Sequence, residues 1–444
     1  MGVGGEAVAE SLAEAGLDVV GVEAELVGGE CPYWACIPSK MMIRAGNLLA
    51  EARRIPGMAG DAEVRPDWTP VAKRIRAEAT DDWDDTVAVD RVTGKGGRFV
   101  RGRAEVAAPD RVEVGGAGVF RPRRGVVLAT GTVPAIPPVD GLADTPYWTN
   151  RDAVSVEELP ASLVVLGGGA VGLELAQAFA RFGVDVTVVE AADRLLPNEE
   201  PESSALIRDA LQAERITVHT ATAAGCVEYD GKGFTVTLDG HGEPVTGERL
   251  LVATGRRPNL DGVVFERLGL DPAAKTVQVD ERMRAADGVW AVGDITGKGA
   301  FTHVATYQAA VAVRDILGHD GPPADYRALS RVTFTDPEVG SVGLTERQAL
   351  DQGLHVATGT AHVASTARGW IHKAGNDGLF KLVADTDDGV LVGATSAGPV
   401  GGEVLAALVV AIHGRVPVEA LRHMIYAYPT FHRGIEDALR DLGA

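Results

Sequence analysis

Runs of apolar residues alternate with short polar or glycine-rich segments along most of the chain, as expected for alternating strands and helices. Residues 163–166 form a continuous apolar run, which is typical of a buried parallel strand. A glycine cluster follows, and residues 173–182 then have the apolar spacing of a helix. The next apolar run, over residues 185–189, predicts a second strand. This order predicts a βαβ unit in the middle of the chain.

The glycine cluster of this unit has the spacing GxGxxG, formed by Gly167, Gly169 and Gly172. In dinucleotide-binding folds, such glycines allow a tight turn, close approach of a pyrophosphate and close packing of helix against strand. Glu190 ends the second strand, at the place where a carboxylate is expected to meet a ribose hydroxyl. An acid there favours NAD over NADP, because a 2′-phosphate would face a negative charge, although Arg194 lies nearby.

A second copy of the pattern stands at the start of the chain. Gly2 and Gly5 precede a helical stretch over residues 7–15, and the apolar run 18–22 ends in Glu23. Glu23 follows Gly5 at the same distance in sequence as Glu190 follows Gly172, so two dinucleotide sites are predicted. No strand and no leading glycine precede Gly2. We therefore expect the first strand of this unit to be missing, and a start codon assigned too far downstream would explain it.

Length and charge narrow the possible partners. A chain of 444 residues is expected to form about two to four domains. Its net charge of −20 disfavours binding to nucleic acids and to anionic membranes, so small molecules are the expected partners. The most apolar long stretch, residues 161–180, is broken by glycines and contains Glu174, so no membrane span is expected. No secretory signal pattern is present, which favours the cytoplasm.

Three cysteines are too few for a disulfide-stabilised secreted scaffold. Cys31 and Cys36 lie close together in a glycine-flanked segment, and in a reducing compartment such a pair is more often catalytic or metal-binding than structural. A zinc site needs about four ligands. The only other cysteine, Cys226, is distant in sequence, so we expect no metal site and a structural role for Cys226.

Residues 28–40, with the sequence GGECPYWACIPSK, resemble the redox loop of the pyridine nucleotide-disulfide oxidoreductases. That family includes dihydrolipoamide dehydrogenase, glutathione reductase and mercuric reductase, and the resemblance covers essentially the whole chain. It implies an α/β fold with two Rossmann-like domains, which bind FAD and NAD(P), and a C-terminal α+β dimerisation domain. The expected boundaries are 1–150 with 266–325 for FAD, 151–265 for NAD(P), and 326–444 for dimerisation.

The resemblance also implies roles for the residues of this loop. Cys31 would exchange with the sulfur of the substrate, and Cys36 would lie against the flavin as a thiolate. A helix start and Lys40 close by would lower the pKa of both thiols. Lys40 would pair with Glu174 beside the flavin. Electrons would pass from NADH to FAD, then to the Cys31–Cys36 disulfide, and finally to a small-molecule or protein-bound disulfide.

Further cofactor contacts are implied at positions that match the family's other motifs. Two Ala-Thr-Gly blocks each follow an apolar strand, and a Gly-Asp pair matches the family's second FAD motif, where the aspartate binds a ribityl hydroxyl. The expected FAD and NAD contacts, besides Lys40 and the glycines and acid of the middle unit, are Gly2, Gly5, Glu23, Gly29, Ala104, Thr130, Gly131, Gly255, Gly293 and Asp294.

The C-terminal part changes character, with strand-like apolar runs over 332–334, 379–383 and 390–393. The helix expected over residues 403–413 is apolar on more than one face, which fits a core or a subunit interface and predicts a homodimer. Residues 333–345 resemble the start of the family's dimerisation domain.

The end of that domain departs from the family. Its HxHPTxxE motif carries an acid/base histidine oriented by a glutamate, but here Tyr428 and Arg433 occupy these positions. Tyrosine, with a pKa near 10, is a poor base at neutral pH but donates hydrogen bonds. His432 could substitute geometrically, but a residue four positions on is expected to face elsewhere on the following helix. Mercuric reductases also carry a tyrosine near this place but add a C-terminal cysteine pair, which residues 438–444 lack.

Two alternatives to a dihydrolipoamide dehydrogenase-like activity remain at this point. One is a reductase of quinones or other electrophiles, which takes electrons directly from the flavin and does not need the histidine. The other is a truncated, non-catalytic member that binds NAD or a partner but does not retain FAD, because the first strand is missing.

Overall fold

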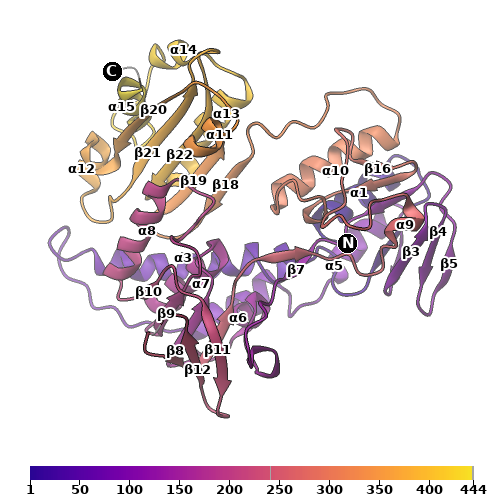
Figure 1. Ribbon diagram of the computed structural model, residues 1–444, viewed down its shortest axis with the longest axis horizontal. Coiled ribbons are helices and arrows are strands. Elements are labelled where there is room, and N and C mark those ends of the chain that lie inside the picture. Colours follow the sequence, from indigo (N-terminus) through magenta and orange to yellow (C-terminus); the bar gives the residue numbers. More distant parts are fainter. Residues whose placement is uncertain (241, 443–444) are drawn as a thin grey trace. The chain divides into compact units, whose positions relative to one another are not determined.

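The computed structural model describes residues 1–240 and 242–442, and the chain divides into two compact units (Figure 1). The first unit comprises Met1–Pro38, Lys73–Ala135 and Arg256–Asp325. The second comprises Ser39–Ala72, Ile136–Gly255 and Tyr326–Ala444. Each unit is therefore built from segments that are far apart in the sequence.

The first unit contains two short pieces of sheet with parallel strand pairs. One pairs β1 (Val20–Glu23) with β2 (Arg98–Arg101), and the other has the order β16–β17–β6. Among the described residues of this unit, no strand joins β1 to β6. The strands of this second sheet are β6 (Val126–Leu128), β16 (Arg284–Ala286) and β17 (Val289–Ala291). The remaining strands of the unit are β3 (Ala104–Ala108), β4 (Arg111–Val114), β5 (Gly118–Phe120), β7 (Thr132–Pro134) and β15 (Arg256–Pro258).

Helices of the first unit cover these strands. Helix α1 (Val3–Glu14) packs against α10 (Thr302–Ile316) and α5 (Thr86–Gly94). The core formed around the strands is apolar and includes Leu128, Val289 and Ile295. The shorter helices are α2 (Glu30–Tyr33), η1 (Ile75–Ala79), α9 (Phe265–Leu268) and η3 (Asp294–Thr296).

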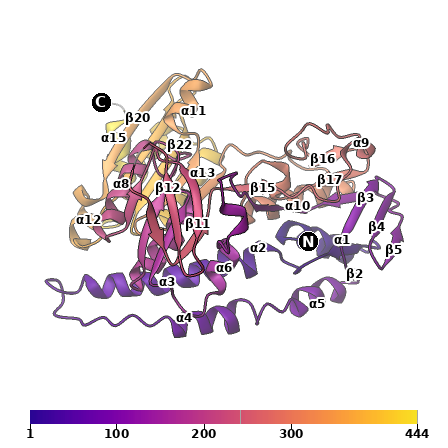
Figure 2. The same cartoon turned by 60° about the horizontal axis from the view of Figure 1, so that its bottom comes forward.

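The second unit contains a parallel four-stranded sheet in the order β10–β9–β8–β14. Its strands are β8 (Ser162–Leu166), β9 (Asp185–Val189), β10 (Thr217–His219) and β14 (Arg249–Val252). A smaller antiparallel sheet consists of β11 (Ala224–Tyr229), β12 (Phe234–Leu238) and β13 (Val245–Gly247). The helices are α3 (Cys36–Arg53), which begins in the first unit and is the longest of the described helices (Figure 2), α4 (Thr69–Arg74), η2 (Leu142–Asp144), α6 (Asn150–Ser155), α7 (Ala170–Arg181) and α8 (Pro201–Ala213).

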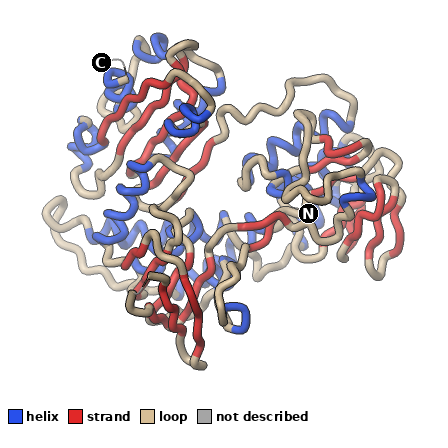
Figure 3. Tube along the Cα trace, in the orientation of Figure 1, coloured by secondary structure: helices blue, strands red, loops and turns tan. Residues whose placement is uncertain are grey.

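The C-terminal part of the second unit is a five-stranded antiparallel sheet in the order β18–β19–β22–β21–β20 (Figure 3). Helix α13 (Gly401–His413) packs on β19 and β22, and α15 (Gly434–Asp441) packs on β20 and β21. The other elements are β18 (Ser330–Thr333), β19 (Glu338–Gly343), α11 (Glu346–Asp351), β20 (Val356–His362), η4 (Val363–Ser365), α12 (Ala367–His372), β21 (Leu379–Asp385), β22 (Val390–Gly398) and α14 (Val418–Arg422).

The predicted elements occur with small shifts at their ends. The helix expected over residues 173–182 begins earlier, at Ala170, because Gly169 takes the extended conformation of an N-cap and the turn after it is already helical. The α/β class is confirmed, with parallel strand pairs in both units and a separate antiparallel sheet with helices in the C-terminal part. Within the described residues, no helix is long and apolar enough to cross a membrane.

A buried ionic cluster connects distant segments of the second unit. The Nζ atom of Lys381, on β21, lies 3.0 Å from Glu200, 2.8 Å from Glu202 and 2.8 Å from Glu346. Burial alone would lower the pKa of Lys381, but the hydrogen bonds to the three carboxylates outweigh burial and raise it. The cluster therefore ties the start of α8 and the start of α11 to the C-terminal sheet.

Candidate active site and cofactor sites

The glycine turn after β8 has a shape that follows from the three glycines. Gly167 adopts a φ of +112°, and a Cβ added there would lie 2.3 Å from the Ala253 carbonyl oxygen. A Cβ at Gly172 would lie 2.3 Å from the Gly167 carbonyl oxygen, whereas a Cβ at Gly169 would meet nothing within 4 Å. The outer two glycines thus allow the helix to pack tightly, and the middle one leaves open space at the helix N-terminus. A dinucleotide pyrophosphate needs this combination.

Glu190 follows β9 and is fixed by the backbone. Its carboxylate accepts hydrogen bonds from the N–H of Gly168, at 2.5 Å, and of Ala192, at 2.6 Å. Arg194 does not compete for the same place, because its guanidinium donates to the Ser204 hydroxyl at 2.6 Å and to a carbonyl oxygen at 2.7 Å. The negative charge of Glu190 therefore lies beside the glycine turn. Such a charge suits a ribose that carries no 2′-phosphate.

The start of the chain repeats this geometry in the first unit. Gly2 is the N-cap of α1, and a Cβ added to it would meet nothing within 4 Å. A Cβ at Gly5 would lie 2.8 Å from the Cβ of Ala129, which resembles the tight packing of Gly172. Glu23 accepts a hydrogen bond from the Glu25 N–H at 2.7 Å and also contacts the amino group of Met1.

Three further candidate FAD residues lie in polar contacts of the first unit. Asp294 begins η3, and its carboxylate accepts a hydrogen bond from the Thr132 hydroxyl at 2.7 Å. Gly293, with a φ of +80°, donates its N–H to Gln308 at 2.7 Å. The Thr130 hydroxyl donates to the Asn259 carbonyl oxygen at 2.5 Å. These contacts order the turns that follow β6 and β17.

The other candidate cofactor positions are turn and strand residues. Gly29 and Gly131 both have a φ of +67°, and Gly255 has a φ of +118°, so each stands where a side chain would strain the backbone. A Cβ on Gly29 would lie 2.8 Å from the Cα of Gly2, so the redox loop starts next to the first glycine turn. Ala104 begins β3.

The two cysteines lie on successive helices of the redox loop. Cys31 is in the one-turn helix α2, and Cys36 is the first residue of α3. The Sγ atom of Cys36 lies 3.4 Å from the hydroxyl of Thr302, which is the first residue of α10. A negative charge is stabilised at a helix N-terminus, and a hydroxyl can donate a hydrogen bond to it. Both features favour the thiolate form of Cys36.

Lys40 lies one turn further along α3, and residues of the second unit contact its ammonium group. Its Nζ atom is 2.7 Å from the carboxylate of Glu174, on α7, and 4.7 Å from the centre of the Phe334 ring. Only 6% of the Glu174 side chain is exposed, and its second oxygen accepts a hydrogen bond from the Phe334 N–H at 2.8 Å. The Lys40–Glu174 pair is thus held in one orientation by backbone as well as by charge.

The family models match nearly the whole chain. Residues 1–309 match the model of the pyridine nucleotide-disulphide oxidoreductases, and residues 329–439 match their dimerisation domain. The protein belongs to this family. Its members are FAD- and NAD(P)-dependent oxidoreductases, so the predicted enzyme class and cofactors are confirmed. The predicted fold, with two dinucleotide-binding domains and a C-terminal dimerisation domain, is confirmed as well.

Individual relatives extend over the same length. The dihydrolipoyl dehydrogenase of Halobacterium salinarum is 34% identical over 98% of this chain and 94% of its own length. A mercuric reductase of Streptomyces lividans is also 34% identical, over 98% of this chain and 93% of its own. The crystal structure of LpdA from Mycobacterium tuberculosis has a TM-score of 0.86 and 25% identity, and covers 100% of this chain and 98% of its own.

In the C-terminal motif, Tyr428 and Arg433 stand at the positions where the family pattern has histidine and glutamate. Tyr428 is 67% exposed, and the guanidinium of Arg433 lies 5.3 Å from the centre of its ring. Tyr426 is buried, donates its hydroxyl to the Leu421 carbonyl oxygen, and has a pKa raised by that burial. The His432 ring is 6.0 Å from the Tyr426 ring. His432 thus packs beside the buried tyrosine, while Tyr428 is accessible.

Three contacts of the candidate site have no signal in the sequence. Thr302, Phe334 and Thr132 each reach their partner from more than a hundred residues away. Cys226 lies on β11, beside an irregularity in its pairing with β12.

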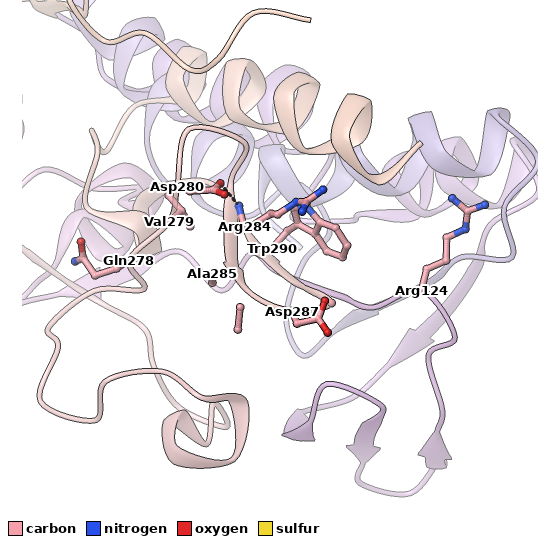
Figure 4. Close-up of a pocket in the computed structure, with 10 residues that line it drawn as sticks. Arg124, Gln278, Val279, Asp280, Arg284, Ala285, Asp287 and Trp290 are labelled. Carbon is pink, nitrogen blue, oxygen red and sulfur yellow. Dashed lines mark hydrogen bonds between the residues drawn. The ribbon is translucent and has the colours of Figure 1, made fainter. Parts of the chain in front are cut away.

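A separate cleft of about 700 Å³ lies in the first unit beside β16 and β17 (Figure 4). Its arginines already have partners, because Arg284 binds Asp315 at 2.9 Å and Arg124 donates to the Ile316 carbonyl oxygen at 2.9 Å. Its polar lining residues are Arg124, Gln278, Asp280, Arg284, Asp287 and Trp290, so none of the candidate catalytic or cofactor residues takes part.

Proposed function

We propose that this protein uses NADH to reduce an oxidised acceptor through the cysteine pair Cys31 and Cys36. The contact between the Cys36 sulfur and the Thr302 hydroxyl carries the proposal. A sulfur at the first residue of one helix, next to a hydroxyl at the first residue of another, is well placed to be held as a thiolate.

The residues of the two glycine turns would hold the cofactors. Gly2, Gly5 and Glu23 suit the adenosine half of FAD, and Asp294 suits its ribityl chain, with Gly29, Ala104, Thr130, Gly131 and Gly293 around it. Bound FAD supplies two-electron chemistry between a nicotinamide and a sulfur. Lys40, oriented by Glu174, would place a positive charge beside the redox pair.

Reduction of a disulfide acceptor would proceed by thiol–disulfide exchange. The Cys31 thiolate attacks one sulfur of the acceptor, which forms a mixed disulfide and releases the first acceptor thiolate. The Cys36 thiolate then attacks the Cys31 sulfur, which closes the Cys31–Cys36 disulfide and releases the second acceptor thiolate. The cysteine pair loses two electrons and the acceptor gains two. Tyr428 would donate a hydrogen bond to the acceptor in place of the usual histidine.

NADH is the proposed reductant rather than NADPH. Glu190 stands at the ribose position with its carboxylate fixed by two backbone N–H groups, and the guanidinium of Arg194 is directed to other partners. Gly167, Gly169, Gly172 and Gly255 would surround the NAD pyrophosphate.

A second candidate function is the reduction of quinones or other electrophiles. The exposed tyrosine at position 428 and the arginine at position 433 leave the site without the histidine and glutamate that assist thiol exchange. An acceptor that takes electrons without proton transfer from a histidine would not need them.

The assembly we propose is a homodimer formed through the dimerisation domain. We assign residues 1–150 and 266–325 to FAD binding, 151–265 to NAD binding and 326–444 to dimerisation. A reducing compartment suits a working dithiol, so the proposed location is the cytoplasm.

A comparison of acceptors in one variant tests the proposal. NADH oxidation would be followed with lipoamide and with a quinone, in the FAD-loaded wild-type protein and in Cys31→Ser, with Cys226→Ser as the matched control. We expect Cys31→Ser to abolish lipoamide reduction. Retention of lipoamide reduction would contradict the cysteine route, and quinone reduction that survives in Cys31→Ser would assign that activity to the flavin alone.

A further inference from the structure

Trp34, within the redox loop, stacks on the ring of Trp83. Trp34 stands between the two cysteines, directly after α2, and its backbone N–H donates to the Glu30 carbonyl oxygen at 2.8 Å. Its ring centre lies 5.4 Å from that of Trp83, with 23° between the ring planes. Offset stacking at this distance is a favourable aromatic geometry. The Trp34 ring, which lies between the two cysteines in the sequence, is thus packed against Trp83.

The segment that carries Trp83 has an unusual backbone. Asp81, Asp82 and Trp83 have φ values of +48°, +56° and +58°, which side chains other than glycine rarely adopt. Two contacts with Arg76 hold the segment. The backbone N–H of Asp82 donates to the Arg76 carbonyl oxygen at 2.7 Å, and the side chains of Asp82 and Arg76 form an ion pair. Such conformations persist only where surrounding contacts enforce them, and they gather at functional sites.

Trp83 also leaves a polar atom without a partner. Its Nε1 atom is buried and makes no hydrogen bond within the part of the chain that the structure describes. Two other tryptophans do make this bond, since Trp68 donates to the Val156 carbonyl oxygen and Trp290 to Asp315. An unpaired buried N–H is unfavourable. The position of Trp83 is therefore set by stacking on Trp34 rather than by its own hydrogen bond.

The same segment holds the other end of the loop. The carboxylate of Asp85 accepts a hydrogen bond from the Val27 N–H at 2.7 Å, and Arg101 binds both of its oxygens, at 2.7 and 2.6 Å. Residues 81–85, which we call the clamp, therefore contact the segment 27–36 at two places, at Val27 before Cys31 and at Trp34 after it.

We propose that Trp83 is a positioning residue for the cysteine pair, and that the clamp holds residues 27–36 in the backbone geometry from which the disulfide closes. The inference rests on the proposed function of Cys31 and Cys36. A disulfide requires a narrow range of Cα separation and side-chain direction. A loop held near that range closes more readily than a loose one, so the clamp raises the equilibrium constant for disulfide formation and makes the pair a stronger reductant.

A redox titration in glutathione buffers tests the inference without any turnover assay. Glutathione disulfide takes two electrons and two protons from the Cys31 and Cys36 thiols, giving two glutathione molecules and the intramolecular disulfide. The oxidised fraction would be read by thiol trapping and mass analysis of the peptide that spans residues 28–40.

Trp83→Gly removes the ring, and glycine adopts a positive φ freely, so backbone strain cannot account for its effect. We expect it to lower the equilibrium constant about tenfold, which corresponds to a potential about 30 mV less negative. Trp83→Phe keeps a stacking ring and should stay within about twofold of the wild type. Trp34→Ala removes the same stack from its other side and should match Trp83→Gly, with no further loss in the double variant. Trp370→Ala, at an exposed tryptophan of the second unit, is the control.

The outcomes separate the inference from the proposed function. If the wild-type cysteines form no disulfide across the buffers, the proposed function fails. If they form it and the variants that lack the stack keep the wild-type constant, the function stands and the positioning role of Trp83 is refuted. Should Trp83→Gly not fold, Trp34→Ala decides between these results.

Discussion

The glycine turns at the start of α1 and at the start of α7 share two glycine positions and differ in the strands that surround them. In both, an open N-cap glycine precedes the helix, and a second glycine packs against the alanine of an Ala-Thr-Gly block, Ala129 or Ala253. In both, the acid at the end of the next strand, Glu23 in β1 or Glu190 directly after β9, accepts a hydrogen bond from the N–H two residues later. Only the second copy has a strand, β8, that joins its sheet into one piece among the described residues.

This difference shows which part of a dinucleotide-binding fold is encoded locally. The turn, the helix and the acid have the same geometry whether or not the neighbouring strands form one sheet. In both copies a glycine of the helix packs against an alanine, which keeps the helix close to the strand that ends before that alanine. The helices also differ at the residue that follows the packing glycine, which is Glu6 in α1 and the fully buried Leu173 in α7.

The largest effect is expected from Gly172→Ala. The new Cβ would lie 2.3 Å from the Gly167 carbonyl oxygen, so α7 has to move away from the turn. We expect a loss of about 1–3 kcal/mol of stability, as for overpacking, and loss of NADH-dependent flavin reduction. Thermal unfolding and stopped-flow reduction by NADH would measure both. Gly115→Ala, in a turn where an added Cβ meets nothing within 4 Å and φ is not positive, is the control; unchanged reduction kinetics in Gly172→Ala would show that the turn tolerates displacement.

Glu190→Gln should have the next largest effect, on coenzyme binding rather than on folding. The amide keeps one acceptor oxygen but loses the charge that favours a ribose hydroxyl over a phosphate. We expect the KM for NADH to rise about tenfold, which corresponds to about 1.4 kcal/mol of binding free energy. The preference of the enzyme for NADH over NADPH should become smaller. Steady-state kinetics with both coenzymes would check this, with Glu228→Gln on the exposed side of β11 as the matched variant. An unaltered coenzyme ratio would mean that Glu190 does not contact the ribose.

Gly5→Ala tests whether the first copy packs as tightly as the second. Its Cβ would lie 2.8 Å from the Ala129 methyl group, a side-chain contact that can relax more easily than the carbonyl contact of Gly172. We expect a smaller destabilisation, about 1 kcal/mol, and a weakened retention of FAD. The FAD content after dialysis and the unfolding temperature would be compared with those of Gly172→Ala. If the two variants lose equal stability, the two turns are equally rigid.

Glu6→Gln is expected to have the smallest effect, and its sign depends on pH. Burial raises the pKa of Glu6 above its ordinary value of about 4.5, against the opposing effect of Arg91. The ionised form is therefore disfavoured in the folded state, and the stability contributed by Glu6 is lost as the pH rises through the raised pKa. We expect Glu6→Gln to stabilise the protein at pH 7 by less than about 1 kcal/mol, after solvent screening, and to match the wild type below pH 4.5. Urea unfolding at both pH values would show it, and a Glu6→Gln protein less stable at pH 7 would assign net stabilisation to the Arg91 pair.

Features confined to a few neighbouring residues were predictable from the sequence. The glycine spacing and the acid predicted that Gly172 and Glu190 belong to one dinucleotide site without any tertiary information, because the order of strand, glycine turn, helix and strand brings the acid back beside the turn. The Lys40–Glu174 pair was expected only from the family resemblance. The Thr302 contact with Cys36 and the stack of Trp34 on Trp83 were not predictable, because they depend on how segments far apart in the chain pack together.

The cluster around Lys381 has a consequence for how the second unit comes apart. Three carboxylates from the starts of α8 and α11 converge on one buried ammonium group in β21. Separating the parallel sheet from the C-terminal sheet would take away Glu200 and Glu202 and leave the buried Lys381 ammonium group with Glu346 as the one remaining partner of the three. We therefore expect these two sheets to melt as one cooperative block, and proteases to cut elsewhere in the chain before they release either sheet as a stable fragment.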